Sequence, residues 1–243
     1  MSRVSLLALA LLMSASIAAA DEAPKPKSDW DIIWEKHLMT DFGWLTKYHD
    51  DDVAVLAQKR PVDVVFMGDS ITELWLGRQA DFWSAGRIDR GISGQTTPQM
   101  LVRFREDVIE LHPKVVHIMA GTNDIAENTG PMTIEQTEAN LTTMAELAKL
   151  HGMKVVFGSV LPASYFFWHK GIEPADMIRK LNRWIKDYAA KTGAGYADYY
   201  AVVDDGKGGM RADYSEDGVH PNEKGYAAMR PVAEAALAQA LKH

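Results

Sequence analysis

The hydrophobic pattern of the chain changes near Pro61. Beyond this residue, short and nearly continuous apolar runs alternate with longer segments whose apolar residues recur at helical spacing. Continuous apolar runs are typical of parallel strands that are buried on both faces. The sequence predicts clear strands at Val62–Met67, Val115–Ala120 and Lys154–Gly158, and weaker ones at Arg87–Ile92 and Tyr196–Asp198. We therefore expect one three-layer α/β domain over residues 61–243, with a central parallel sheet of about five strands.

Helix signals fall between these strands. Thr97-Pro98 is typical of an N-cap followed by proline at the first helical position. A further helix is expected to begin near Pro174. The last helix should run from about Asn222 to the end of the chain, and Pro231 should kink it or split it.

The first twenty residues have a different character. Arg3 precedes an apolar run from Val4 to Met13, and Ala18–Ala20 supplies small residues at the end. This pattern is typical of a cleavable secretory signal peptide, and the run is too short to span a bilayer. We therefore expect a periplasmic or secreted protein.

Residues 21–60 are interpreted as a linker followed by an N-terminal helical extension. Residues 21–28 are polar and contain two prolines, which is typical of a solvated linker. Residues 29–59 are rich in aromatic side chains at spacings closer to helical than to alternating. We interpret their tryptophans as packing against the main domain rather than as a binding surface.

Composition narrows the possible partners. The chain has 243 residues, a formal net charge of −7, 47% hydrophobic and 24% charged residues, as in an ordinary soluble globular domain. The acidic balance and the absence of a Lys/Arg cluster argue against nucleic acid as a partner. Because there is no cysteine, disulfides, thiolate chemistry and a lipid attachment site are excluded.

Four polar stretches follow predicted strands or lie near the C-terminus: Gly68-Asp69-Ser70, Gly91–Thr97, Gly121–Asp124 and Asp217–Asn222. Ligands of open parallel sheets bind at the carboxyl ends of strands, so these stretches are the candidate site. In content and in order they resemble the signature blocks of the SGNH (GDSL) hydrolase family. The resemblance covers about residues 61–243 and implies a flavodoxin-like fold and ester hydrolysis through a serine.

A serine nucleophile needs a base to take its proton and a third group to orient that base. The resemblance assigns these roles to Ser70, His220 and Asp217, in that order. The G-x-S-x-G motif of α/β-hydrolases is absent. Activity is expected to fall as His220 becomes protonated, near the ordinary imidazole pKa of about 6.5.

The resemblance also implies an oxyanion hole made by the backbone N–H of Ser70, the N–H of Gly94 and the side-chain amide of Asn123. Asp69 and Asp124 could instead form the carboxylate pair of a glycosidase. We expect them rather to accept hydrogen bonds from backbone N–H groups in tight turns.

Substrate preference should depend on loops. Residues 159–173 contain the aromatic run Tyr165–Trp168 without strand or helix periodicity. These rings either form a pocket wall or cover the core, and the sequence leaves both open. No metal-ligand or nucleotide-binding motif is present, so neither a metal nor a cofactor is implied.

Together these features predict an exported serine ester hydrolase that works through an acyl-enzyme and removes small acyl groups, such as acetyl, from a carbohydrate. A lysophospholipase or an acyl thioesterase is the enzymatic alternative. A catalytically silent carbohydrate-binding protein is the non-enzymatic one. The expected partner is a small-molecule or polysaccharide ester, without nucleic acid and without stable membrane insertion.

Overall fold

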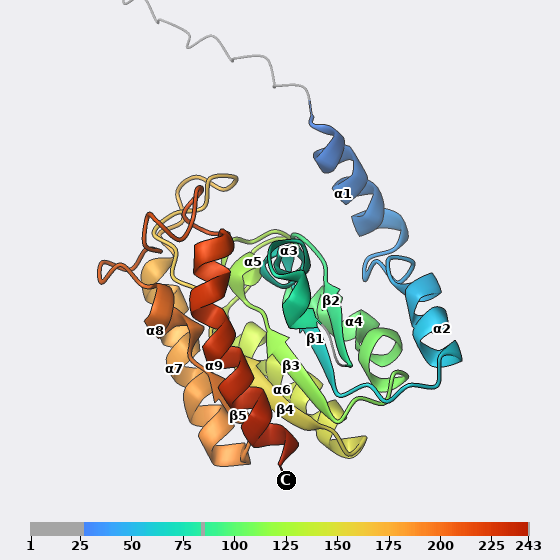
Figure 1. Ribbon diagram of the computed structural model, residues 1–243. Helices are drawn as coiled ribbons and strands as arrows, with labels where there is room; N and C mark the ends of the chain where they lie inside the picture. The colour runs from blue at the N-terminus through green and yellow to red at the C-terminus, as the bar shows by residue number, and fades with distance from the viewer. Residues whose placement is uncertain (1–26, 84–85, 243) are drawn as a thin grey trace, which may run out of the picture.

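The computed structural model describes residues 27–83 and 86–242, and Figure 1 shows its ribbon. The predicted signal peptide (residues 1–20) and residues 21–26 of the predicted linker lie outside the described residues. The described chain forms a central sheet of five parallel strands with helices on both faces. The predicted three-layer α/β class is confirmed.

The strands lie in the spatial order β2 (Arg87–Gly91), β1 (Val64–Gly68), β3 (Val115–Met119), β4 (Lys154–Gly158) and β5 (Gly195–Ala197). All five predicted strands are present, and their ends differ from the predicted ones by no more than two residues. This order, 2-1-3-4-5, is the flavodoxin-like one, in which ligands bind at the carboxyl ends where the strand order reverses.

The sheet separates two apolar cores. One face packs against α4 (Thr97–Phe104), α6 (Ile134–Leu150) and α7 (Ala175–Thr192). The other packs against α3 (Ser70–Arg78), α8 (Tyr199–Val203) and α9 (Glu223–Leu241). Shorter elements are η1 (Ala80–Trp83), the π-helical turn η2 (Arg105–Ile109) and α5 (Thr122–Ile125).

Alternate residues of β1 serve the two cores, as the period of a strand requires. Val65 and Met67 belong to the core under α4, whereas Val64 and Phe66 belong to the core under α3. All five residues of β1 are buried. The apolar run in the sequence is therefore continuous because both faces of this strand are covered.

Two glycines let α3 lie close to the carboxyl ends of β1 and β2, where Gly68 pairs with Gly91. A Cβ on Gly68 would lie 2.0 Å from the Thr72 hydroxyl oxygen, and one on Gly91 would lie 2.2 Å from the Glu73 backbone nitrogen. Neither approach is possible for a larger residue. The first turn of α3 is thus held at the sheet edge where the polar stretches meet.

The helix at residues 97–111 differs from the prediction. Its N-cap is Thr96 rather than Thr97, with a capping box completed by Gln99. The helix continues into η2 (Arg105–Ile109) instead of remaining α-helical. Thr97 instead contacts Asp124: its backbone N–H donates to the Asp124 carboxylate at 3.0 Å.

The expectation that Pro231 splits the last helix is wrong. α9 runs without interruption from Glu223 to Leu241 with this proline inside it. The helix packs along the α3 face, and buried residues such as Tyr226 and Met229 precede the proline while Ala233 and Leu237 follow it. Packing on both sides of Pro231 maintains the helix despite the missing N–H donor.

The N-terminal extension is helical, as expected. It forms α1 (Asp29–Thr40) and α2 (His49–Ala57), and α1 lies outside the three layers, at the upper right of Figure 1. Ser28 caps α1 through a capping box with Asp31. In the ranges 27–83 and 86–242, no helix is both long enough and apolar enough to cross a bilayer.

Candidate active site

Ser70 occupies the first position of α3, directly beyond the carboxyl end of β1. The N-cap is Asp69, whose carboxylate accepts a hydrogen bond of 2.9 Å from the Ile71 N–H. The cap fixes the chain where it turns from strand to helix, so the Ser70 side chain starts from a rigid backbone.

His220 lies beside Ser70, although 150 residues separate them in sequence. Its Nε2 is 2.8 Å from the Ser70 hydroxyl oxygen, and its Nδ1 is 2.7 Å from Asp217 Oδ2. The imidazole comes from the loop before α9, whose N-cap Asn222 accepts from the N–H groups of Lys224 and Gly225. His220 is thus within hydrogen-bonding distance of both Ser70 and Asp217, the two residues predicted to act with it.

The loop holds Asp217 with several donors. Its Oδ1 accepts from the backbone N–H groups of Val219 and His220 at 2.9 and 2.8 Å, and from the Ser215 hydroxyl at 3.2 Å. Partial burial raises the pKa of Asp217, but these backbone bonds and the imidazole together hold it below its usual value. An ionised Asp217 favours a proton on Nδ1 of the imidazole and leaves Nε2 free to accept from Ser70.

Gly94 and Asn123 follow β2 and β3 and lie at the same edge as Ser70. The Asn123 amide nitrogen donates to the Gln95 carbonyl at 3.0 Å, and its oxygen accepts from the Asn128 amide at 2.9 Å. The Asn128 amide also donates to the Gly94 carbonyl at 3.0 Å. Gly94 has a φ of +80°, a conformation that favours glycine. Asn128 therefore connects the two residues expected in the oxyanion hole.

One pocket of about 510 Å³ contains all of the expected site residues except Asp217. Asp217 lies behind the His220 ring. The lining combines the polar groups with four aromatic side chains and Leu74: Trp30, Asp31, Trp34, Ser70, Leu74, Ser93, Gly94, Asn123, Asn128, Phe167, Trp168 and His220.

The aromatic run of residues 165–168 contributes both to the core and to the wall of the pocket, the two alternatives that the sequence left open. Phe166 is 2% exposed and belongs to the core, whereas Phe167 and Trp168 line the pocket. The Trp168 indole N–H donates to the Asn128 side-chain oxygen at 2.9 Å, and the Tyr165 hydroxyl donates to the Asp217 carbonyl at 3.0 Å. The loop is therefore tied to both halves of the site.

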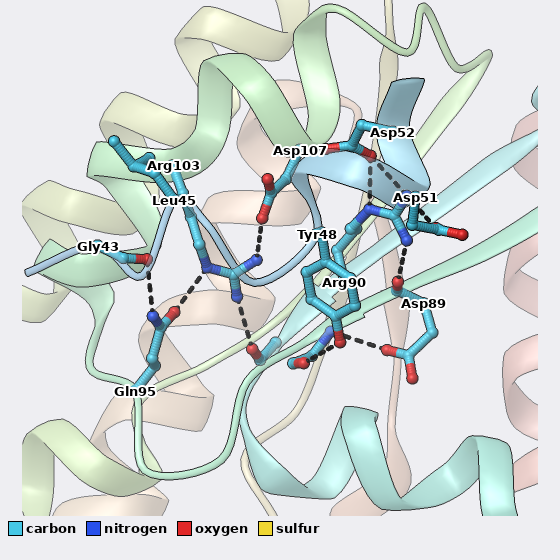
Figure 2. A network of polar contacts seen from close by, with 12 residues as sticks. Gly43, Leu45, Tyr48, Asp51, Asp52, Asp89, Arg90, Gln95, Arg103 and Asp107 are labelled. Atoms are coloured by element: carbon cyan, nitrogen blue, oxygen red, sulfur yellow. Dashed lines mark hydrogen bonds and ion pairs between the residues drawn. The ribbon is translucent and has the colours of Figure 1, made fainter. Parts of the chain in front are cut away.

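The buried side chain of Arg103 bonds to residues on two sides of the candidate site, and Figure 2 shows its polar contacts. Arg103 donates to the Gly68 carbonyl at 3.0 Å, to the Gln95 side chain at 2.6 Å and to the Asp107 carboxylate at 2.7 Å. Gly68 precedes the Asp69–Ser70 turn, and Gln95 follows Gly94. One guanidinium thus holds the Gly68 carbonyl and the Gln95 side chain, on two sides of the candidate site.

Asp69 and Asp124 are buried and do not line the pocket. Asp69 accepts from the Ile71 N–H, and Asp124 accepts from the Thr97 N–H and from the Thr97 and Thr137 hydroxyls. Burial raises the pKa of each carboxyl to about 6. Their bonds to backbone N–H groups agree with the expected structural use.

Several residues of this site were not identified from the sequence, among them two tryptophans and an asparagine. The tryptophans of residues 29–59 were interpreted as packing, but Trp30 and Trp34 line the pocket, while Trp44 stacks on His37 with ring centroids 3.7 Å apart. Asn128 lay in a connection without a recognisable motif. Its position five residues after Asn123, in the loop after β3, is the one signal that could have identified it.

Comparison with known proteins identifies the family of the chain. Residues 66–228 match the model of the GDSL-like lipase/acylhydrolase family. The chain is also similar to the uncharacterized lipoprotein YqeF of Bacillus subtilis (strain 168), with 30% identity over 118 residues, which are 41% of this chain and 49% of that protein. The chain thus matches about half the length of this curated relative.

Solved structures extend the comparison. A GDSL-like lipase from Bacteroides thetaiotaomicron VPI-5482 has 43% identity and a TM-score of 0.79, covering 82% of this chain and 100% of that one. A protein from Bacteroides fragilis NCTC 9343 has 41% identity and a TM-score of 0.79, covering 83% and 99%. An acetylxylan esterase from Geobacillus stearothermophilus shares the fold at 20% identity and a TM-score of 0.59, covering 72% and 93%. The chain therefore belongs to the GDSL-like lipase/acylhydrolase family.

Proposed function

We propose that the protein is a serine ester hydrolase in which Ser70 is the nucleophile, His220 the general base and Asp217 the group that orients it. The observation that carries this proposal is the continuous hydrogen-bonded chain from the Ser70 hydroxyl through both imidazole nitrogens to the Asp217 carboxylate, at 2.8 and 2.7 Å. Each step of acyl transfer needs a proton moved along this line.

In the first half-reaction, Ser70 Oγ attacks the ester carbonyl while its proton passes to Nε2 of His220. The ester bond to the alcohol then breaks, and the imidazolium returns this proton to the leaving oxygen. In the second half-reaction, His220 takes a proton from water, which attacks the acyl-serine carbonyl. The bond from the acyl carbon to Ser70 Oγ then breaks, the imidazolium returns the proton to Ser70 Oγ, and the acid is released. Asp217 stabilises the imidazolium in both halves.

The negative charge on the carbonyl oxygen is proposed to be stabilised by the N–H groups of Ser70 and Gly94 and by the Asn123 amide. Ser70 begins α3, and the first N–H groups of a helix have no intrahelical acceptor. Removing one such donor typically costs about 10²–10³ in rate. The contact between Asn128 and Asn123 supports this role because it fixes which end of the amide faces Gln95.

The proposed substrate is a small acyl ester, such as an acetyl ester, of a carbohydrate. The four aromatic rings of the pocket and its polar rim support this choice, because sugar rings offer C–H faces to aromatic side chains and hydroxyl edges to polar ones. We further propose that the protein is exported. The signal-like pattern of residues 1–20 and the lipoprotein relative support this location.

Ser70→Ala provides the direct test. We expect kcat for p-nitrophenyl acetate to fall at least about 10³-fold while the melting temperature stays close to that of the wild type. Ser164→Ala, at an exposed serine outside the pocket, is the matched control and should keep full activity. Unchanged hydrolysis in Ser70→Ala would disprove the nucleophile assignment.

A series of p-nitrophenyl esters tests the acyl group. We expect kcat/KM to be highest for acetate and to fall as the acyl chain lengthens. A maximum at long chains would favour a lysophospholipase instead, and a preference for acyl thioesters would favour a thioesterase.

A further inference from the structure

The pocket has a wall that comes from α1, outside the residues matched by the family model. Trp30 and Trp34 are one helical turn apart, and their rings stack with centroids 6.0 Å apart and planes 21° from parallel. Trp30 is 45% exposed. Trp34 is partly exposed. Since large aromatic side chains are usually covered in a folded protein, a stacked pair with one exposed ring that borders a pocket indicates a binding surface.

This wall lies directly against the candidate oxyanion hole. A Cβ built on Gly94 would be 3.2 Å from the Trp34 ring and 3.5 Å from the Trp30 ring. A group held on these indoles is therefore close to Gly94. Such a group would be the alcohol portion of an ester whose carbonyl is at Ser70.

The chain after α1 is anchored to the main domain at several points. The carbonyls of Phe42 and Gly43 each accept a hydrogen bond of 2.9 Å, from Gln99 and Gln95 respectively. Figure 2 shows that Gln95 joins Gly43 to the buried Arg103. α1 is thus attached to the same backbone segment that contains Gly94, so its tryptophans are held at a defined place beside the site.

A second wall borders the site from the His220 side. The rings of Phe167 and Trp168 lie 6.3 Å from the imidazole ring, measured between centroids. They are 52% and 38% exposed. Because the Trp168 indole is hydrogen-bonded to Asn128, its ring has a fixed orientation.

The rest of the lining distinguishes between two kinds of ligand. Asp31, Ser93 and Asn128 contribute polar groups to the same pocket. A fatty acyl chain gains nothing from such groups and loses by their desolvation. A sugar ring uses both surfaces, because its faces carry C–H groups and its rim carries hydroxyls that donate to carboxylate and amide oxygens.

We propose that α1 is a substrate-binding element, in which Trp30 and Trp34 hold a sugar ring of the ester against the wall formed by Phe167 and Trp168. This inference rests on the proposed function for the identity of the ester. It adds that the specificity for the alcohol portion of the ester comes from a helix that precedes the hydrolase domain.

The test compares the Trp30→Ala/Trp34→Ala double variant with Ile33→Ala, which changes an exposed residue of the same helix that does not line the pocket. Two substrates are used: acetylated xylotriose, and ethyl acetate, whose alcohol has no ring. We expect the double variant to raise KM for acetylated xylotriose about tenfold, as the loss of ring stacking implies. Its kcat/KM for ethyl acetate should fall by a smaller factor than that for acetylated xylotriose, and Ile33→Ala should change neither.

A binding measurement separates this inference from the proposed function. Calorimetric titration of the Ser70→Ala protein with acetylated xylotriose, cellotriose and chitotriose reports the site without turnover. We expect at least one sugar to bind, and the added Trp30→Ala/Trp34→Ala change to weaken it about tenfold.

If no sugar binds, or if binding is unaffected by the tryptophan changes, α1 is not a sugar-binding element even when Ser70-dependent ester hydrolysis is present. A loss of activity in the double variant confined to long-chain esters would also overturn the inference. Conversely, sugar binding that needs both tryptophans would support it even if Ser70→Ala retained hydrolysis.

Discussion

Asn128 contacts three parts of the candidate site through one side chain. Its amide nitrogen donates to Asn123 Oδ1 and to the Gly94 carbonyl, and its oxygen accepts from the Trp168 indole. Because Asn123 Oδ1 and one of its N–H groups are already bonded, the remaining N–H is the donor available to a substrate. Asn128 is therefore expected to position the oxyanion hole without contacting the oxyanion.

We expect Asn128→Asp to lower kcat for p-nitrophenyl acetate by about 10–100-fold, with a smaller effect on KM, because misplaced oxyanion donors stabilise mainly the transition state. The substitution keeps the size of the side chain, removes the donor to Asn123 and adds a negative charge near the developing oxyanion. Steady-state kinetics of the variant at neutral pH give both parameters.

Asn140→Asp is the control for the effect of charge alone. Asn140 donates to the Thr97 hydroxyl at 3.0 Å and does not line the pocket. The kcat of the Asn140→Asp enzyme should therefore change little. An Asn128→Asp enzyme with wild-type kcat and an altered KM would mean that Asn128 binds substrate and does not position the oxyanion donors.

The difference between Asn128 and Ser70 shows what the sequence could predict at the residue scale. Ser70, Gly94, Asn123, Asp217 and His220 lie in short blocks whose order is characteristic of a family, and the structure brings all five together. Asn128 and the α1 tryptophans lie outside such blocks. Their positions depend on how the loops and α1 pack, which the spacing of residues along the chain does not encode.

At the scale of elements, the three central strands β1, β3 and β4 were predictable because they are almost entirely buried and consequently nearly continuous in apolar residues. The edge strands β2 and β5 are only partly buried, and their signals in the sequence are correspondingly weaker. The ends of the helices were less predictable from the sequence. Thr96 and Thr97 are chemically alike. The choice of Thr96 as N-cap leaves Thr97 to bond Asp124 in α5, the short helix after β3. Long-range contacts of this kind, and the packing that keeps α9 intact at Pro231, decide where local signals are ambiguous.

The ion pair between Arg103 in α4 and Asp107 in η2 joins these elements to the sheet. Both side chains are buried, at 0% and 2% exposure, and the arginine also bonds the Gly68 carbonyl and Gln95. We expect Arg103→Met to lower the free energy of unfolding by about 3–5 kcal/mol, because it leaves the Asp107 carboxylate buried without its partner. Urea denaturation gives the value.

Arg103→Met/Asp107→Leu separates the charge from the packing. If the buried carboxylate causes the loss, the double variant should recover a large part of the stability. Its kcat should nevertheless remain below that of the wild type, because the bonds to Gly68 and Gln95 beside the candidate site are still missing. Full recovery of kcat in the double variant would show that Arg103 has no role in positioning the site.

At the scale of the whole molecule, several carboxyls are buried near the carboxyl edge of the sheet. Burial raises the pKa of Asp69 and Asp124 to about 6 and that of Asp89 to about 7, from an ordinary value of 3.8. The buried imidazole of His117 shows the opposite shift, because burial lowers its pKa to about 3 from 6.5. In every case the folded protein favours the neutral form.

These shifts determine how stability depends on pH. Between about pH 4 and pH 7, the folded state binds more protons at the three aspartates than the unfolded state does, so raising the pH through this range destabilises the protein. His117 acts in the opposite direction from about pH 3 to pH 6.5, since there the unfolded state binds the additional proton. Burial also raises the pKa of Asp52 to about 6, so four carboxyls oppose one imidazole. We expect a higher melting temperature at pH 5 than at pH 8.

Asp89→Asn tests the origin of this dependence, because it removes the carboxyl with the largest of the three shifts and retains an oxygen that can accept from the Gly91 N–H. Calorimetry should show a melting temperature at pH 8 raised by more than about 4 °C over the wild type, and little difference at pH 4, where the wild-type carboxyl is already neutral. Asp176→Asn, at an exposed aspartate, should leave the dependence on pH unchanged. Equal gains at pH 4 and pH 8 for Asp89→Asn would instead assign the effect to packing. A gain in melting temperature that depends on pH therefore assigns the destabilisation at neutral pH to the charge of the buried Asp89 carboxyl.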